Sequence, residues 1–205
     1  MEKIIGTHNS MTYLRPTKWW MRMLNVFAKC QCYDIDTQFE NDARCFDIRV
    51  SYNWRTSKWE FRHGLIVYSF NDPEKDKKPI DYVLDTIAQL GEKYDTTPIV
   101  RLILEKTKDE KTESYMFPLL CKDVEDTYKD KIIFIGGYRK KDWERLYNFP
   151  NEDEITTTQF VSSMVKKNIL PCEKVLPFLY AKHSNKYNRE HLENGVNLFD
   201  FIGKY

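Results

Sequence analysis

The sequence has little of what marks fibrous, low-complexity or membrane-spanning chains. Its 205 residues include only 7 glycines and 8 prolines, which excludes a collagen-like or linker-rich polypeptide. No apolar run approaches the ~20 residues that a transmembrane helix needs. The chain also has no large excess of charge of one sign, because its 32 Lys and Arg nearly balance its 31 Asp and Glu and leave a net charge of +1. We therefore expect no nucleic-acid partner, since such partners select for a strongly basic surface.

The first residues and the cysteines predict a reducing compartment. Residues 1–5 run directly into a Gly-Thr-His turn, without the apolar segment of a signal peptide. The 5 cysteines are odd in number, and Cys30 and Cys32 form a CxC pair with no second pair to complete a zinc-finger spacing. We expect reduced thiols in a cytoplasmic protein without a signal peptide, with peripheral membrane contact left open.

Bulky side chains are abundant. Hydrophobic residues make up 41% of the chain and aromatic residues 15%, which is enough to fill a core. We find no internal repeat and no linker-like stretch. The prediction is one monomeric domain that covers residues 1–205.

Short apolar runs alternate with longer amphipathic segments. We expect strands over 3–5, 44–50, 59–62, 99–104, 132–135, 176–181 and 197–202, and helices over 19–29, 80–94, 116–128 and 158–167. Strands separated by helices indicate parallel βα units and an α/β fold. Periodicity alone does not choose between a small barrel and an open doubly wound sheet.

Chemically capable side chains lie in or just after several of the predicted strands. His8 follows the first strand, His63 ends the third, and Asp200 lies in the last. Asp47 and Arg49 are two residues apart on one strand, so they face the same way. The carboxyl ends of parallel strands share one edge of a sheet, where sites are built.

Two imidazoles, an arginine and nearby carboxylates favour acid–base attack at phosphorus. One imidazole would take a proton from a hydroxyl and the other would protonate the leaving oxygen. A guanidinium can hold two phosphate oxygens, and a carboxylate can fix the tautomer of an imidazole. Each residue taken singly also has an ordinary structural interpretation, as part of a turn, an ion pair or a cap.

The motifs resemble a known family in their order and spacing. The matching segments are Gly-Thr-His-Asn-Ser-Met-Thr-Tyr over 6–13, Gln38, Ala-Arg-Cys-Phe-Asp-Ile-Arg-Val over 43–50, and His63-Gly64. They resemble the X-domain of phosphatidylinositol-specific phospholipases C. Residues 99–105 and 197–202 resemble later strands of that domain. The resemblance is dense over 1–105 and thin over 106–190.

The resemblance implies a compact, distorted TIM-type (β/α) barrel that cleaves the phosphodiester of phosphatidylinositol-type lipids. In that family the inositol 2-hydroxyl attacks phosphorus, which yields a cyclic inositol phosphate and diacylglycerol. The implied catalytic set is His8 as general base, Asp200 holding its imidazole, His63 as general acid, Arg49 on the phosphate, and Asp47 and Asn9 beside them. Glu105, Lys106 and Tyr138 are the candidate substrate-binding residues. With 205 residues against the ~250 of a usual barrel, we expect shortened or missing helices.

The resemblance leaves two alternatives for a metal. Calcium-using members carry two carboxylates two residues apart on the second strand. Metal-independent bacterial members carry an arginine at one of those positions, where this sequence has Arg49. Asn9 and Glu105 look like the calcium-type residues, so Asn9, Asp47 and Glu105 could supply oxygen ligands for Ca²⁺. A guanidinium and Ca²⁺ would repel in one small site. We predict chemistry without a metal or other cofactor, with Ca²⁺ as the alternative.

The segment 19–27 contains Trp19, Trp20 and further bulky apolar residues. It is either a helix that rests transiently in a lipid interface or a core helix that covers the end of the barrel. Two other functions stay open. One is a related phosphodiesterase acting on a glycerophosphodiester or on a soluble cyclic or nucleotide phosphodiester. The other is a catalytically silent module that binds lipid head groups.

Overall fold

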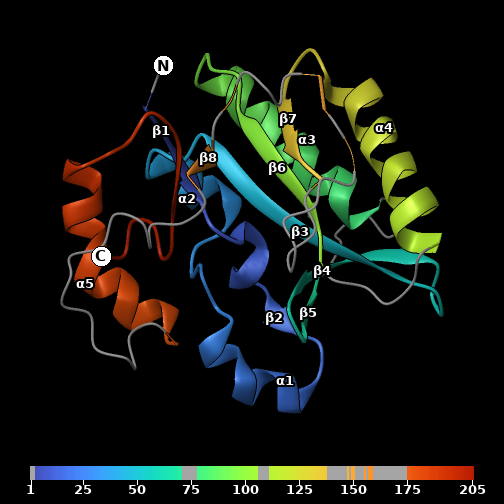
Figure 1. Cartoon of the computed structure of the whole chain (residues 1–205), viewed down its shortest axis with the longest axis horizontal. Coiled ribbons are helices and arrows are strands. Elements are labelled where there is room, and N and C mark those ends of the chain that lie inside the picture. Colours follow the sequence, from blue (N-terminus) through green and yellow to red (C-terminus); the bar gives the residue numbers. More distant parts are fainter. Residues whose placement is uncertain are drawn as a thin grey trace.

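The computed structural model describes residues 3–70, 78–105, 111–137, 147, 149–150, 155, 157–158 and 175–205. Parallel strands form its centre, in the order β8 (Thr157–Thr158), β9 (Gly195–Phe199), β1 (Lys3–Thr7), β3 (Cys45–Asn53), β6 (Ile99–Leu104) and β7 (Ile133–Gly136). This sheet curls into half of a barrel (Figure 1). The predicted α/β fold is confirmed, and the curl favours the distorted TIM-type barrel over an open sheet.

An antiparallel extension continues from the far end of β3. Its last residues pair with β4 (Lys58–His63), which pairs with β5 (Ile66–Ser69), which pairs with β2 (Arg15–Pro16). The turn between β4 and β5 contains Gly64 at φ 56°, a conformation that glycine adopts at little cost. The sequence did not predict β2 or β5, because both are short and depend on this pairing.

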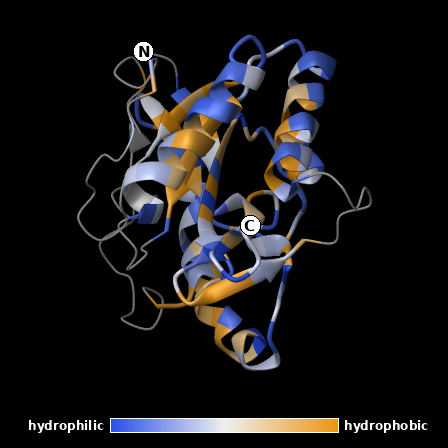
Figure 2. Cartoon of the chain, turned by 90° about the vertical axis from the view of Figure 1, so that its right-hand side faces the viewer, coloured by the Kyte–Doolittle hydropathy of each residue, from blue (hydrophilic) through white to orange (hydrophobic). Residues whose placement is uncertain are grey.

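The helices α3 (Pro79–Lys93) and α4 (Phe117–Tyr128) lie beside β6 and β7, and a π-helical turn, η3 (Thr112–Met116), precedes α4 (Figure 1). The buried face of α3 consists of Ile80, Val83, Leu84, Ile87, Ala88, Leu90 and Gly91. A Cβ on Gly91 would come within 2.7 Å of Pro98 Cδ, so only glycine lets the following turn pack this closely. Figure 2 shows hydrophobic strands inside and helices that alternate between hydrophobic and hydrophilic residues.

The helices between β1 and β3 are all short. After the 3-10 turn η1 (Ser10–Tyr13) come α1 (Trp19–Leu24), the 3-10 turn η2 (Asn25–Phe27) and α2 (Ile35–Glu40). Asp34 caps α2, since its Oδ1 accepts a hydrogen bond of 3.0 Å from the backbone N–H of Thr37. Helices this short agree with the expectation drawn from the chain length.

Four of the predicted elements need correction or lie beyond the described residues. The strand predicted over 197–202 ends at Phe199, so Asp200 follows the strand. The helix predicted over 19–29 ends early, at Leu24, and the 3-10 turn η2 follows it. The strand predicted over 176–181 is wrong, because this segment begins helix α5 (Pro177–Glu190). Of the helix predicted over 158–167, residue 158 ends β8 and the rest lies outside the described residues.

The helix α5 escaped detection for a physical reason. Its buried positions are Ala181, Ser184, Asn185 and Asn188, so its buried face is mostly polar. A polar buried face produces no apolar periodicity, while the apolar run over 176–181 looks like a buried strand. In the part of the chain that the structure describes, every helix is too short or too polar to cross a bilayer.

Candidate active site

The register of the parallel strands aligns charged side chains across the barrel. Thr7 pairs with Phe46 on one side and with Phe199 on the other. The next residue of β1, His8, therefore stands between Asp47 and Asp200. Asp47 in turn pairs with Arg101 on β6. We call Asp200, His8, Asp47 and Arg101 the cross-strand row.

The tautomer of His8 follows from its neighbour in this row. His8 Nδ1 lies 2.8 Å from Asp200 Oδ1, and an ionised carboxylate only accepts hydrogen bonds. Nδ1 therefore carries the hydrogen, and Nε2 carries the lone pair that a general base needs. Nε2 lies 4.0 Å from Asp47 Oδ2. The side chains of His8 and Asp200 are 13% and 14% exposed, so solvent reaches the ring.

Buried polar residues hold the chain that follows β1. Gln31 Nε2 donates to the carbonyl oxygens of His8 (3.1 Å) and Phe199 (2.7 Å), which ties β1 to β9 at the site. Asn9 adopts a left-handed conformation at φ 50°, and its backbone N–H donates to Asp47 Oδ2 at 3.1 Å. The buried Nδ2 of Asn9 has no hydrogen-bond partner among the described residues. It is a donor that a ligand oxygen could satisfy.

The carboxylate of Asp47 is fully buried between two arginines. Its Oδ2 accepts from Arg49 Nε at 3.1 Å and Nη2 at 2.8 Å, and its Oδ1 lies 3.6 Å from Arg101 Nη1. Burial alone would raise the pKa of this carboxyl. The charges of Arg49, Arg101 and His8 outweigh burial and hold the pKa of Asp47 well below its ordinary value.

Arg49 also lies close to a second carboxylate. Its Nη1 is 3.6 Å from Oε1 of the buried Glu105. Burial alone would lower the pKa of Arg49, because it disfavours the charged guanidinium. The negative charges of Asp47 and Glu105 outweigh burial and raise this pKa above its ordinary value. The residues therefore do not fit Ca²⁺. Two of the side chains that would bind it, Asp47 and Glu105, already face the buried guanidinium of Arg49. A second cation would have to displace that guanidinium.

The second imidazole comes from the end of β4. His63 Nδ1 lies 2.6 Å from the carbonyl oxygen of Ala28, so Nδ1 carries the hydrogen here too. The neighbouring Gly64 N–H donates to Glu105 Oε1 at 3.3 Å, which ties the hairpin to the site. The rings of His8 and His63 are 5.9 Å apart between centroids and meet edge-on at 80°. Two imidazoles with matching tautomers thus lie close together.

The comparisons with known proteins concern the fold. No protein-family model and no curated protein sequence matches the chain. Among solved structures, a phosphatidylinositol-specific phospholipase C from Staphylococcus aureus matches with a TM-score of 0.59 and 15% identity, covering 98% of this chain and 86% of that one. The enzyme of the same name from Listeria monocytogenes matches with a TM-score of 0.54 and 19% identity, covering 98% and 89%.

This chain has the fold of phosphatidylinositol-specific phospholipase C. The resemblance found in the sequence is thereby confirmed at the level of the fold. For the S. aureus enzyme, modulation of its membrane binding is described.

Within the phospholipase C fold, most of the predicted residues converge. The structure brings together His8, Asn9, Asp47, Arg49, His63, Glu105 and Asp200. Lys106 and Tyr138 lie outside the described residues. Their predicted part in substrate binding stays a prediction.

Three residues of the site were missed in the sequence. Arg101 could have been noticed, because it is a lone charge inside the apolar run 99–104. Cys30 and Gln31 carry no such signal, since neither lies in a predicted strand or beside a motif residue. Cys30 is fully buried, and its Sγ lies 3.9 Å from His63 Nδ1.

The segment with the two tryptophans is exposed. Trp19 is 72% exposed and Met23 70%, and Met21 is the one buried residue of α1. Val26 and Phe27 of η2 are exposed too. The core-helix interpretation is therefore wrong. We call α1 and η2 together the apolar segment. The helix α1 projects at the bottom of Figure 1, and that end of the molecule shows both hydrophobic and hydrophilic residues in Figure 2.

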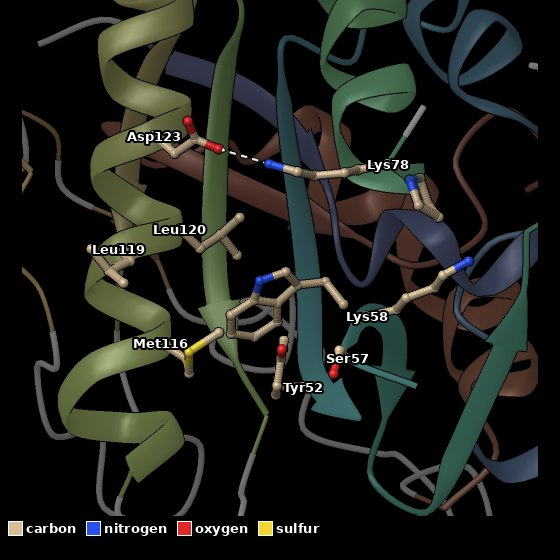
Figure 3. A pocket seen from close by; sticks show the side chains of 10 residues that line it. Tyr52, Ser57, Lys58, Lys78, Met116, Leu119, Leu120 and Asp123 are labelled. Atoms are coloured by element: carbon tan, nitrogen blue, oxygen red, sulfur yellow. Dashed lines mark hydrogen bonds and ion pairs between the residues drawn. The ribbon is translucent and has the colours of Figure 1, made fainter. Parts of the chain in front are cut away.

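A cavity of about 490 Å³ lies elsewhere, between the β3–β4 hairpin and α4 (Figure 3). Tyr52 and Trp59 line one side, and Met116 and Leu120 line the other. Lys78 Nζ donates to Asp123 Oδ2 across it at 3.1 Å. None of the described candidate residues lines this cavity. The candidate site is thus separate from this cavity.

Proposed function

We propose that residues 1–205 form a single phospholipase C-like catalytic domain that cleaves phosphatidylinositol-type lipids. The observation that carries the proposal is the pair of imidazoles, His8 and His63, each with Nδ1 hydrogen-bonded to an acceptor. Nε2 of each ring is then the atom that would transfer a proton at one phosphodiester. The fold supports the substrate class.

His8 is the proposed general base. Its Nε2 takes the proton of the inositol 2-hydroxyl while the hydroxyl oxygen bonds to phosphorus. Asp200 is a positioning residue, because its hydrogen bond of 2.8 Å fixes the ring and stabilises the imidazolium that forms. Asp47 Oδ2, 4.0 Å from Nε2, adds negative charge on the other side.

His63 is the proposed general acid. As imidazolium it donates Nδ1–H to the carbonyl of Ala28 and delivers the Nε2 proton to the glycerol oxygen as the P–O bond breaks. The products are a cyclic inositol phosphate and diacylglycerol. One proton has moved to His8 and one has left His63, so exchange with solvent restores both rings.

When no metal is bound, another positive group must stabilise the negative charge of the phosphate. Arg49 provides it, and the contacts with Asp47 and Glu105 hold its guanidinium in place before substrate arrives. Asn9 Nδ2 is a further donor for a phosphate or inositol oxygen. We propose metal-independent catalysis because the carboxylates that would bind Ca²⁺ already pair with Arg49.

The apolar segment is the proposed membrane contact. Trp19 and Trp20 would enter the lipid interface transiently, as a peripheral contact of a monomer. The next residue after η2, Ala28, accepts the hydrogen bond of His63, so lipid contact would lie beside the acid.

The decisive experiment is ³¹P NMR of the products. Purified protein is incubated with phosphatidylinositol vesicles, a glycerophosphodiester and soluble cyclic and nucleotide phosphodiesters, with excess EGTA or with Ca²⁺. We expect a cyclic inositol phosphate at equal rates in both conditions. Cleavage of another phosphodiester alone would favour the related phosphodiesterase, and binding without turnover would favour the silent module. Activity lost in EGTA and restored by Ca²⁺ would overturn the metal-independent mechanism.

A further inference from the structure

A thiol lies beside the proposed acid–base pair and has no part in the proposed chemistry. Cys30 Sγ is fully buried, donates weakly to the carbonyl of Ala28 at 3.4 Å, and lies 3.9 Å from His63 Nδ1. Cys30 Sγ, one ring nitrogen of His8 and one carboxylate oxygen of Asp200 all lie within 4.8 Å of one another. Three side chains of different chemistry thus offer ligand atoms to one point.

A nitrogen, a thiolate sulfur and a carboxylate oxygen are typical ligands of Zn²⁺, whereas Ca²⁺ takes oxygen alone. Zinc–ligand bonds of about 2.0–2.3 Å put tetrahedral ligand atoms roughly 3.3–3.8 Å apart. The largest spread of 4.8 Å therefore needs a contraction of about 1.0–1.5 Å. The side chains of His8 and Asp200 are partly exposed, so solvent reaches two of the three residues.

The charges of this set also suit a divalent cation. Thiolate and carboxylate together cancel the two positive charges of Zn²⁺, so the filled site is neutral and does not repel the guanidinium of Arg49. The set Asn9, Asp47 and Glu105 considered for Ca²⁺ does not have this charge balance, because Asp47 and Glu105 already neutralise Arg49.

We propose that His8, Cys30 and Asp200 form a Zn²⁺ site that switches the enzyme off. The metal would replace the hydrogen between His8 Nδ1 and Asp200, and that hydrogen would move to Nε2 of the ring. An imidazole in that state accepts no proton, so the base is lost. Binding releases one proton to solvent, from the thiol, because Nε2 takes up the hydrogen that Nδ1 gives up. A water completes the tetrahedron.

Metal binding is independent of the proposed function, whereas inhibition rests on it. The binding test uses Co²⁺ as a spectroscopic stand-in for Zn²⁺, with the full chain. We expect one Co²⁺ per chain, a thiolate-to-cobalt charge-transfer band, and displacement of both by Zn²⁺. Cys30→Ser should remove the band and weaken metal binding by at least about tenfold.

Cys32→Ser is the matched control, because Cys32 is two residues away, is partly exposed, and is not a member of the cluster. It should keep the band. Asp200→Asn should keep the band but bind about tenfold more weakly, and it serves if Cys30→Ser does not fold. Absence of the band in the wild type, its persistence in Cys30→Ser, or its equal loss in Cys32→Ser would overturn the site.

The second arm measures the ratio of rates with and without Zn²⁺, so that differences in basal rate cancel. We expect Zn²⁺ to stop the wild type and Cys32→Ser, and to slow Cys30→Ser at least about tenfold less. An active wild type that binds Co²⁺ through Cys30 but ignores Zn²⁺ would overturn the switch. A chain that shows the band but cleaves no phosphodiester would overturn the proposed function and leave the metal site intact.

Discussion

The cross-strand row and the apolar segment depart from the usual burial of side chains in opposite directions. In the row, Asp47 and Arg101 are charged and almost fully buried. In the apolar segment, Trp19 and Met23 are apolar and mostly exposed. Proteins normally bury apolar side chains and leave charges in water, so both regions are informative.

The difference lies in what holds each region in place. Register and hydrogen bonds fix the row: Asp47 alone accepts from Arg49 and from the backbone of Asn9. The apolar segment has one buried side chain, Met21, whose Sδ accepts a hydrogen bond of 3.4 Å from Thr17 Oγ1. Burying a charge network costs desolvation energy. Leaving apolar area exposed loses the stabilisation that its burial would give. Neither arrangement is explained by stability alone, which is consistent with the proposed reaction site and the proposed lipid contact.

The largest effect should come from the imidazoles. His8→Ala and His63→Ala should each lower kcat/KM on phosphatidylinositol by about 10²–10⁴-fold, because each removes a proton-transfer group. Circular dichroism should stay unchanged, since neither ring fills the core. His191→Ala is the control: its exposed ring follows α5 and should not affect the rate. Full activity in either test variant would refute the mechanism.

The next effect concerns the stability of the row. Asp47→Asn should lower the free energy of unfolding by about 3 kcal/mol, because Arg49 and Arg101 would stay buried without their shared carboxylate. Urea unfolding at pH 7 measures this. Asp42→Asn is the matched control, since Asp42 is 70% exposed and its pair with Arg189 is long at 3.8 Å. Equal losses in the two variants would mean that burial of the row does not matter.

The apolar segment should affect binding and not chemistry. Replacing Trp19 and Trp20 with Ala should weaken binding to phosphatidylinositol vesicles about tenfold and spare hydrolysis of a soluble substrate. Vesicle sedimentation and a soluble-substrate assay separate the two effects. Trp54→Ala is the control, because Trp54 is also exposed but lies in the β3–β4 turn. Unchanged vesicle binding in the double variant would remove the segment's proposed role.

The smallest effect is the pH dependence of the row. The pKa of Asp47 is depressed in the folded state, so its stabilisation is complete above the unfolded pKa and is lost as pH falls towards the folded pKa. The gap in unfolding free energy between wild type and Asp47→Asn should be about 1 kcal/mol narrower at pH 3 than at pH 6. A gap that stays constant over this range would contradict the depressed pKa.

Local pattern was enough for part of the fold and of the site. The apolar periodicity of α3 and the buried run of β6 predicted both elements, because each packs a regular apolar face. The two-residue spacing of Asp47 and Arg49 correctly placed them on one face, where they form an ion pair. Segments whose buried faces are polar, such as α5, or whose pairing comes from distant residues, such as β2 and β5, gave no local signal.

By itself the sequence determined the α/β class, the residue types of the site and their order along the chain. These follow from periodicity and from motifs that each lie within a few neighbouring residues. Only the tertiary structure decided that Arg101 faces Asp47, that Cys30 lies beside both imidazoles, and that the tryptophans face solvent. Strand register and loop packing set these facts, and both depend on contacts between residues far apart in the chain, which no local pattern records.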